Sequence, residues 1–260
     1  MTSSFPTQLL VLAANTLREL VRSKLLYNLL IFAVLLMAGS MFVAQLTVGQ
    51  WDRIILDMGL AATQIVGLLL SVLIGVGLVA GEIDRKTIYP TLAHPISRAT
   101  FLLGRYAGLM LVLAINVLVM LGVLALTLHL AGYALSRTAV EAVLLIFVEL
   151  SLLSAAALFF GSFTTPMLAA AFSFSLFLIG HLLGDLRAFG QRSHSEMAKL
   201  ATRIAYRLLP DLSLLDVKAQ AASQLPVEAH AVWTAAIYGL CYTAVLLVLA
   251  VIVFRKRDLK

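Results

Sequence analysis

The residues of this chain that could carry out chemistry are few and far apart. The only cysteine, Cys241, cannot form a disulfide within the chain. None of the five histidines has a cysteine or a glutamate at the spacing of metal ligands; they are His94, His129, His181, His194 and His230. The sequence also contains no GxSxG or HExxH motif, and no aspartate pair that would bind a metal and a nucleotide-linked lipid headgroup. We therefore predict no metal site, no catalytic residue and no cofactor in this chain.

A nucleotide-binding loop is suggested only superficially, by Gly81, Lys86 and Thr87. A P-loop requires the pattern GxxxxGK[ST], and here Arg85 stands where the second glycine belongs. No buried strand precedes the segment either. We conclude that this chain is not expected to bind ATP, and that another chain binds it if the protein uses ATP.

Glu149 is the most unusual ionisable residue, because it lies inside a long apolar stretch. An ionised carboxylate within a membrane is costly unless it is paired, hydrated or protonated. Two interpretations stay open: Glu149 lies on a substrate or gating path, or it fixes helix packing by bonding Asn116 or a serine of another span. His181 and His129 are interpreted as hydrogen-bonded packing residues. Glu141 is expected to be solvated near a membrane end.

The spacing of the charges reveals the elements that must position these residues. Of the 260 residues, 62% are hydrophobic and only 12% are charged, whereas about a quarter of a soluble domain is charged. Asp, Glu, Lys and Arg are absent from five long gaps, at residues 25–51, 58–81, 106–136, 150–184 and 229–254. Each gap can hold a membrane-spanning helix, which needs roughly 20 apolar residues. This pattern excludes an ordinary soluble enzyme.

The stretch 138–184 is too long for one span. Pro166 begins a helix far better than it continues one, so we place a break at residues 161–166. The sequence therefore predicts an all-α polytopic membrane protein with six transmembrane helices, at about residues 25–46, 59–80, 103–128, 139–161, 166–184 and 232–254. Pairs of glycines at the inner ends of spans two and three predict close helix packing there; they are Gly77 with Gly81 and Gly104 with Gly108.

Six spans put both termini on one side of the membrane, and the positive-inside rule indicates which side. If the termini are inside, eleven lysines and arginines lie on the inner side and eight on the outer side. Six of the outer eight belong to the long segment 185–230, much of which lies away from the membrane ends. Without that segment the ratio is eleven to two, which predicts cytoplasmic termini. The net charge of +6 then reflects topology and contact with anionic membrane lipids rather than nucleic acid.

Two inner segments carry patterned charges. Residues 1–24 are predicted to form an amphipathic interfacial helix, with Asn15, Arg18, Glu19 and Arg22 on one face and Leu10, Leu17 and Val21 on another. The alternative is that these residues are a simple cytosolic extension of the first span. Residues 81–100 have an acidic start, a basic middle and two prolines, which predicts a short, rigid, polar structure that can transmit force between the membrane and a docked partner.

The segment 185–230 is the largest piece predicted to lie outside the membrane. Residues 195–209 place Glu196, Lys199, Arg203 and Arg207 on one face, which predicts a second interfacial helix that ends at Pro210. A shorter helix at about residues 212–222 is expected to follow. The segment could gate an exit, contact an outer-side or periplasmic partner, or cap the bundle, and the sequence does not separate these alternatives.

The sequence resembles the permeases of ABC-2 type transporters, in particular small six-span bacterial members such as the gliding-motility and nitrous-oxide-reductase maturation permeases. The resemblance covers essentially the full length as one transmembrane domain, 1–260. It is carried by the basic amphipathic start at residues 16–24, the loop 81–87 leading to residues 94–98, Gly104-Arg105-Tyr106, and Leu208-Leu209-Pro210. Lys86 and Pro90 depart from the common form, where glycine and an uninterrupted helix are more usual.

The resemblance implies a permease subunit in a bacterial plasma (inner) membrane that forms a homodimer. Two copies of a cytoplasmic ATPase subunit would dock beneath it and bind ATP and Mg²⁺. The loop would act as the coupling helix that contacts the ATPase, through Glu82, Asp84, Arg85, Lys86, Thr87, Pro95 and Arg98. Hydrolysis would drive export or signalling across the membrane.

Two other classes of function stay open. The chain could be an anchor or assembly protein that transports nothing and holds an outer-side partner through residues 185–230. Less favoured is an intramembrane enzyme built around Glu149. A neighbouring gene for an ATPase with a Walker motif would favour the permease.

Overall fold

The computed structural model describes residues 5–45, 50–81, 97–192, 197, 200, 202, 204, 206–207 and 209–256. Within these residues the secondary structure is entirely helical. Six helices are long and apolar enough to cross a membrane, at Leu26–Gln45, Trp51–Gly81, Arg98–Leu130, Arg137–Gly161, Pro166–Leu186 and Ala229–Lys256. The predicted fold class and the six predicted spans are therefore confirmed.

The helices that contain these spans are α2 (Lys24–Gln45), α3 (Trp51–Val76), α6 (Arg98–Leu130), α7 (Arg137–Gly161), α8 (Pro166–Arg192) and α11 (Ala229–Lys256). A π-helical turn, η1 (Gly77–Gly81), extends α3. Three shorter elements complete the described fold: α1 (Phe5–Val21), η2 (Leu212–Leu215) and α10 (Lys218–Ala222).

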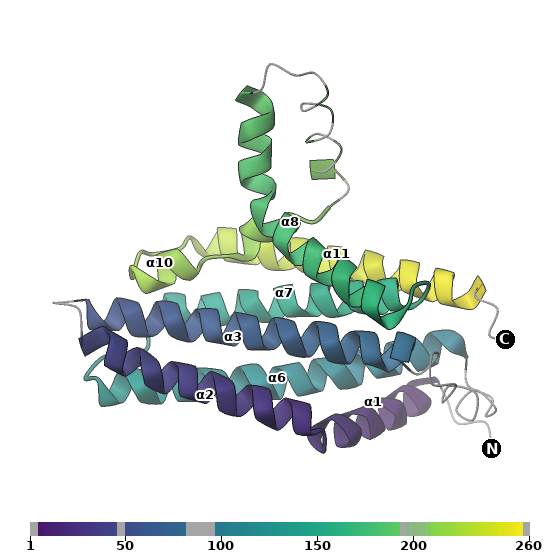
Figure 1. Ribbon diagram of the computed structural model, residues 1–260, viewed down its shortest axis with the longest axis horizontal. Coiled ribbons are helices and arrows are strands. Elements are labelled where there is room, and N and C mark those ends of the chain that lie inside the picture. The colour runs from purple at the N-terminus through teal and green to yellow at the C-terminus, as the bar shows by residue number, and fades with distance from the viewer. Residues whose placement is uncertain are drawn as a thin grey trace.

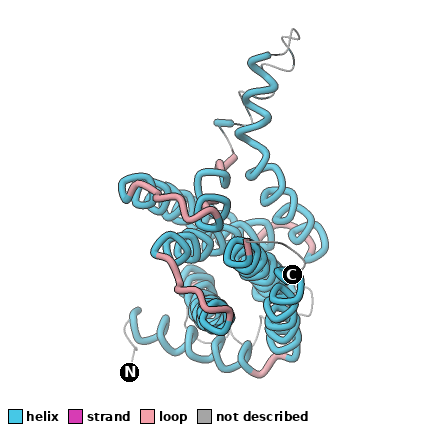
Figure 2. The backbone as a smooth tube through the Cα atoms, turned by 90° about the vertical axis from the view of Figure 1, so that its left-hand side faces the viewer, coloured by secondary structure: helices cyan, strands magenta, loops and turns pink. Residues whose placement is uncertain are grey.

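Helices α3 and α7 form the centre of the bundle. In their most apolar stretches 72% and 78% of the residues are buried, compared with 17% in α2. Helices α2 and α6 pack against α3, whereas α8 and α11 pack against α7 (Figures 1 and 2). The start of α1 and the end of α11 lie at the same end of the bundle (Figure 1). We call this the terminal end, and the other the opposite end.

Local signals explain where the helices begin and end. The hydroxyls of Ser97 and Ser136 cap α6 and α7 by accepting hydrogen bonds from Thr100 N at 3.0 Å and Ala139 N at 3.2 Å. Gly132, with a φ of 85°, makes the left-handed turn between these two helices. Helix α8 begins at Pro166, which confirms the predicted break.

Two boundaries differ from the prediction by more than four residues. The second span begins at Trp51 rather than 59, and the third at Arg98 rather than 103. The prediction followed the gaps between charges, but a charged residue ends the membrane-embedded part of a helix and not the helix itself. The first turns of α3 carry Asp52 and Asp57 and continue the same backbone hydrogen bonding beyond the apolar stretch.

Helix α1 packs closely against the first half of α6. A Cβ at Gly104 would lie 2.7 Å from Leu12 Cβ, and one at Gly108 would lie 2.9 Å from Ala13 O, so only glycine allows this approach. The packing predicted for this glycine pair is therefore present. Gly77 and Gly81 differ, since nothing among the described residues lies within 4 Å of a Cβ built there.

Candidate functional site

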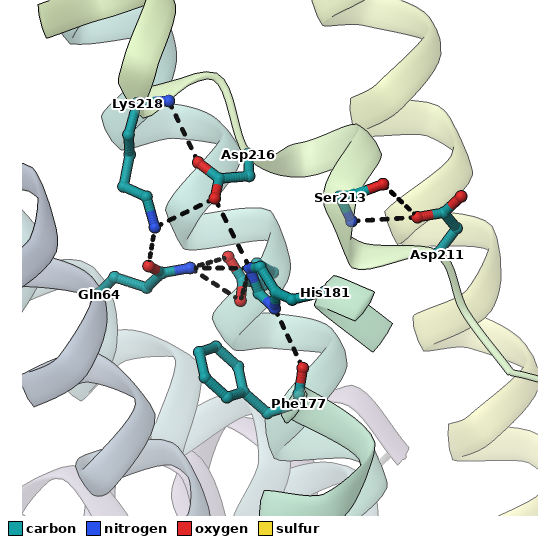
Figure 3. Close-up of polar contacts among 8 residues, drawn as sticks. Gln64, Phe177, His181, Asp211, Ser213, Asp216 and Lys218 are labelled. Atoms are coloured by element: carbon teal, nitrogen blue, oxygen red, sulfur yellow. Dashed lines mark hydrogen bonds and ion pairs between the residues drawn. The ribbon is translucent and has the colours of Figure 1, made fainter. Parts of the chain in front are cut away.

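A cluster of five polar side chains lies in the interior of the bundle (Figure 3). We call it the polar cluster and define it as Gln64 of α3, Glu149 of α7, His181 of α8, and, from the segment η2–α10, Asp216 directly after η2 and Lys218 at the start of α10. Four separate elements therefore contribute to one network. Gln64 and Glu149 follow the first residues of their helices by 13 and 12 positions, or about 20 Å of helix at 1.5 Å per residue. The cluster is thus far from either end of the bundle.

Gln64 is the branch point of the polar cluster. Its Nε2 donates to Glu149 Oε1 at 3.1 Å and to Glu149 Oε2 at 2.8 Å. Its Oε1 accepts a hydrogen bond from Lys218 Nζ. Because a lysine ammonium only donates and a carboxylate accepts, these two contacts fix which way the Gln64 amide points. Glu149 is fully buried, and Gln64 is 4% exposed.

Asp216 and Lys218 bring a pair of opposite charges to the cluster. Lys218 Nζ lies 3.3 Å from Asp216 Oδ2, and the Lys218 backbone N–H donates to Asp216 Oδ1 at 3.2 Å. The second contact fixes the Asp216 carboxylate at the start of α10. The ammonium therefore has one carboxylate partner from its own segment and one amide partner from α3.

His181 closes the network from α8. Its Nδ1 lies 3.0 Å from the carbonyl oxygen of Phe177, which can only accept, so Nδ1 carries the proton. The Nε2 atom lies 3.3 Å from Gln64 Nε2, 3.6 Å from Glu149 Oε1 and 3.9 Å from Asp216 Oδ2. The imidazole thus contacts all three other elements of the cluster.

Close packing against glycines of two spans allows η2 and α10 to reach the polar cluster. A Cβ at Gly180 would lie 2.6 Å from Leu212 Cγ, and one at Gly239 would lie 3.4 Å from Leu215 Cδ1. Leu212, Leu215 and Ala221 are fully buried or nearly so. Residues 210–222 belong to the segment that the sequence analysis predicts to lie outside the membrane. In the structure they pack among α3, α7, α8 and α11, because small residues on these helices leave room for them.

Side-chain hydrogen bonds fix the conformation of residues 211–224 and attach them to the spans. Asp211 Oδ1 accepts hydrogen bonds from Ser213 N at 3.1 Å and Ser213 Oγ at 2.5 Å, which caps η2. The Asp211 backbone N–H donates to the Tyr238 hydroxyl of α11 at 2.8 Å. At the other end, Gln224 donates to Asp52 Oδ2 at 2.7 Å. The segment is therefore tied at three places: to α11, to the polar cluster and to the start of α3.

The predicted partner of Glu149 is wrong in one respect. Gln64, and not Asn116 or a serine, donates the hydrogen bonds to the Glu149 carboxylate. Asn116 is 1% exposed, and its side chain has no hydrogen-bond partner within the part of the chain that the structure describes. Glu141 forms an i,i+4 ion pair with Arg137 at 2.8 Å rather than standing alone in solvent.

Most of the predicted coupling residues cannot be placed. Glu82, Asp84, Arg85, Lys86, Thr87 and Pro95 lie outside the described residues, as does most of the predicted helix at 195–209. Arg98 is described, and its Nη1 donates to the carbonyls of Phe254 and Arg255, both at 3.1 Å. It therefore binds the last turn of α11, where helix carbonyls have no partner within the helix.

The predicted interfacial residues lie on α1 beside α6. Glu19 Oε2 accepts from Arg105 Nη1 at 2.8 Å, and Thr16 Oγ1 accepts from the same atom at 3.2 Å. Arg18 and Arg22 are exposed. Leu10, Val11 and Val21 are exposed as well, so α1 has a face toward α6, an apolar face and a charged face.

Three members of the polar cluster were not predicted from the sequence. Gln64 could have been predicted, because a glutamine within an apolar span needs a hydrogen-bond partner, as Glu149 does. Asp216 and Lys218 could not have been predicted, since nothing in the sequence indicates that their segment packs back into the bundle.

The described residues contain no group of three or more His, Cys, Asp or Glu side chains arranged so that it could hold a metal ion. The side chains of the polar cluster instead bind one another, and they come from four elements that are distant in sequence. A family model for the ABC-2 family transporter protein matches residues 10–259. The chain belongs to the ABC-2 transporter family. It is therefore a multi-pass membrane protein and a transport subunit of the permease type. No curated protein matches the sequence.

Proposed function

We propose that this ABC-2 family protein is the permease of a bacterial plasma-membrane exporter driven by a separate ATPase subunit. The match over residues 10–259 carries this proposal. The sequence lacks a P-loop, so ATP and Mg²⁺ would be bound by the partner. Two ATPase copies would dock under a homodimer of the permease, on the cytoplasmic side where both termini lie.

The segment 82–98 is proposed to contact the ATPase. It joins α3 to α6, and the start of α6 is bound to both terminal helices of the chain. Arg98 holds the end of α11, and Phe101 stacks on Phe254 with ring centroids 6.2 Å apart. Arg105 holds α1. A push on the segment would therefore reach α1, α6 and α11 together.

Charge reversal within the segment tests this proposal. Glu82→Lys and Arg85→Glu are each expected to dissociate the ATPase or to uncouple its hydrolysis from the permease. The matched control is Arg137→Glu, which reverses an exposed charge at the first residue of α7, outside the segment 82–98. Normal assembly and ATP hydrolysis in both segment variants would refute the coupling role.

A further inference from the structure

We propose that residues 210–224, which run from the polar cluster to Asp52 at the start of α3, form a movable gate, and that the hydrogen bond between Lys218 and Gln64 is its latch. The inference deepens the proposed function, since a gate has a role only if the permease opens. The movement itself can be measured on this chain alone, so the latch and the transporter assignment can fail separately.

The segment has two dissimilar attachments. Its first half is apolar and well packed, because Leu212 and Leu215 fill the space beside Gly180 and Gly239. Its second half is attached by charge, through Asp216 and Lys218 (Figure 3), and otherwise buries only the small side chains of Ala221 and Ala222. The side chains of Lys218 and Asp216 are 18% and 28% exposed, and the attraction within such a partly buried ion pair scarcely exceeds the cost of taking its two charges out of water. The charged half is therefore close to balance between a bound and a released position.

Gln64 controls the balance between the bound and the released position, because it binds both the Lys218 ammonium and the Glu149 carboxylate. It accepts from Lys218 with one atom and donates to Glu149 with the other. On release, Lys218 and Asp216 would regain hydration together as an ion pair. Glu149 would keep its bonds to Gln64 and would not be left without a partner. The spans can thus remain folded while the segment moves.

Gln224, where the segment ends, would serve as the hinge of this movement. Gln224 has a φ of 52°, the left-handed conformation that a residue with a side chain adopts at a cost. Its side chain is bound to Asp52 at the exposed start of α3. A change of backbone conformation at Gln224 would swing α10 away from α3 and α7, which it contacts in the closed position.

Thiol labelling of the full-length chain in proteoliposomes tests the latch. Cys241→Ala removes the native thiol, and Ala222→Cys places a new one on α10, where Ala222 is 4% exposed. A membrane-impermeant maleimide should label it slowly in the closed position. Gln64→Met and Lys218→Met should each raise the labelling rate about tenfold or more, since a hydrogen bond to a charged group is lost.

A matched control separates the latch from general loosening. Thr243→Val removes the 3.3 Å hydroxyl contact with Ser151 between α11 and α7 without touching the segment, and labelling should not change. Hydrogen exchange of residues 210–224, measured without Ala222→Cys, should show the same order of variants. Equal rates in wild type, both latch variants and the control would overturn the latch.

Cross-linking tests the gate. A Cβ at Gly184 would lie 3.6 Å from Ser213 Oγ, so Gly184→Cys with Ser213→Cys should form a disulfide that fixes η2 to α8 and limits how far the adjoining charged half of the segment can move. In the complex with the ATPase, the cross-link should lower ATP hydrolysis, and reductant should restore it. Hydrolysis at the uncross-linked rate would overturn the gate. Labelling that responds to the latch variants in a chain that binds no ATPase would instead refute only the proposed function.

Discussion

Replacing Gln64 by leucine should destabilise the protein more than replacing Glu149 by leucine. Gln64→Leu removes two hydrogen bonds from a fully buried carboxylate and one acceptor from the Lys218 ammonium. Removing one partner of a buried charged network costs about 3–5 kcal/mol. Here the Glu149 carboxylate would lose its hydrogen-bond donor, since His181 Nε2, 3.6 Å from Glu149 Oε1, carries no proton. Glu149→Leu removes that charge and leaves Gln64 bound to Lys218, so its expected cost is about 1–2 kcal/mol.

The double variant makes the comparison sharper. If the two effects were independent, Gln64→Leu with Glu149→Leu would cost the sum of the single values. Because leucine at both positions leaves no unpaired carboxylate, we expect the double variant to be more stable than Gln64→Leu alone. Equilibrium unfolding of the full-length protein in mixed micelles measures all three free energies of unfolding. Additive values, or a Gln64→Leu cost below about 1 kcal/mol, would refute the network as described.

Three further results are expected from the packing and the ion pairs. Gly108→Val should detach α1 from α6 by a clash with Ala13 O, whereas Gly122→Val should be tolerated, since apart from its own helical turn nothing among the described residues lies within 4 Å of a Cβ there; proteolysis of α1 distinguishes them. Glu19→Ala should cost less than about 1 kcal/mol in unfolding experiments and have less effect at high salt, because this half-exposed pair is screened. Gly180→Val should displace η2 and raise hydrogen exchange in residues 210–224, an increase that Gly122→Val should not produce.

The spans could be predicted from the sequence because a bilayer imposes a minimum length of apolar residues. That constraint located all six helices and the break before Pro166. It located the start of α3 poorly, because the charges of Asp52 and Asp57 show where the apolar layer ends and not where helical hydrogen bonding ends. The face of α6 that receives α1 was also indicated, by Gly104 and Gly108.

The polar cluster could be predicted only in part. Glu149 was conspicuous because a carboxylate in an apolar span requires a partner, and His181 was singled out for a similar reason. The actual partner, Gln64, lies 85 positions earlier in the sequence, and helical periodicity does not pair residues across helices. Lys218 could not be assigned, because the packing of Leu212 and Leu215 against glycines of two spans is a tertiary effect.

Purification of the tagged full-length chain from its native membrane, with mass spectrometry of the proteins that accompany it, tests the central claim most directly. The account predicts an ATPase subunit with a Walker motif in equal number to the permease, and ATP hydrolysis by the purified complex. Loss of that subunit in the Arg85→Glu variant, but not in Arg137→Glu, would agree with the account. Purification of the chain with only an outer-side protein, and with no ATPase, would contradict it.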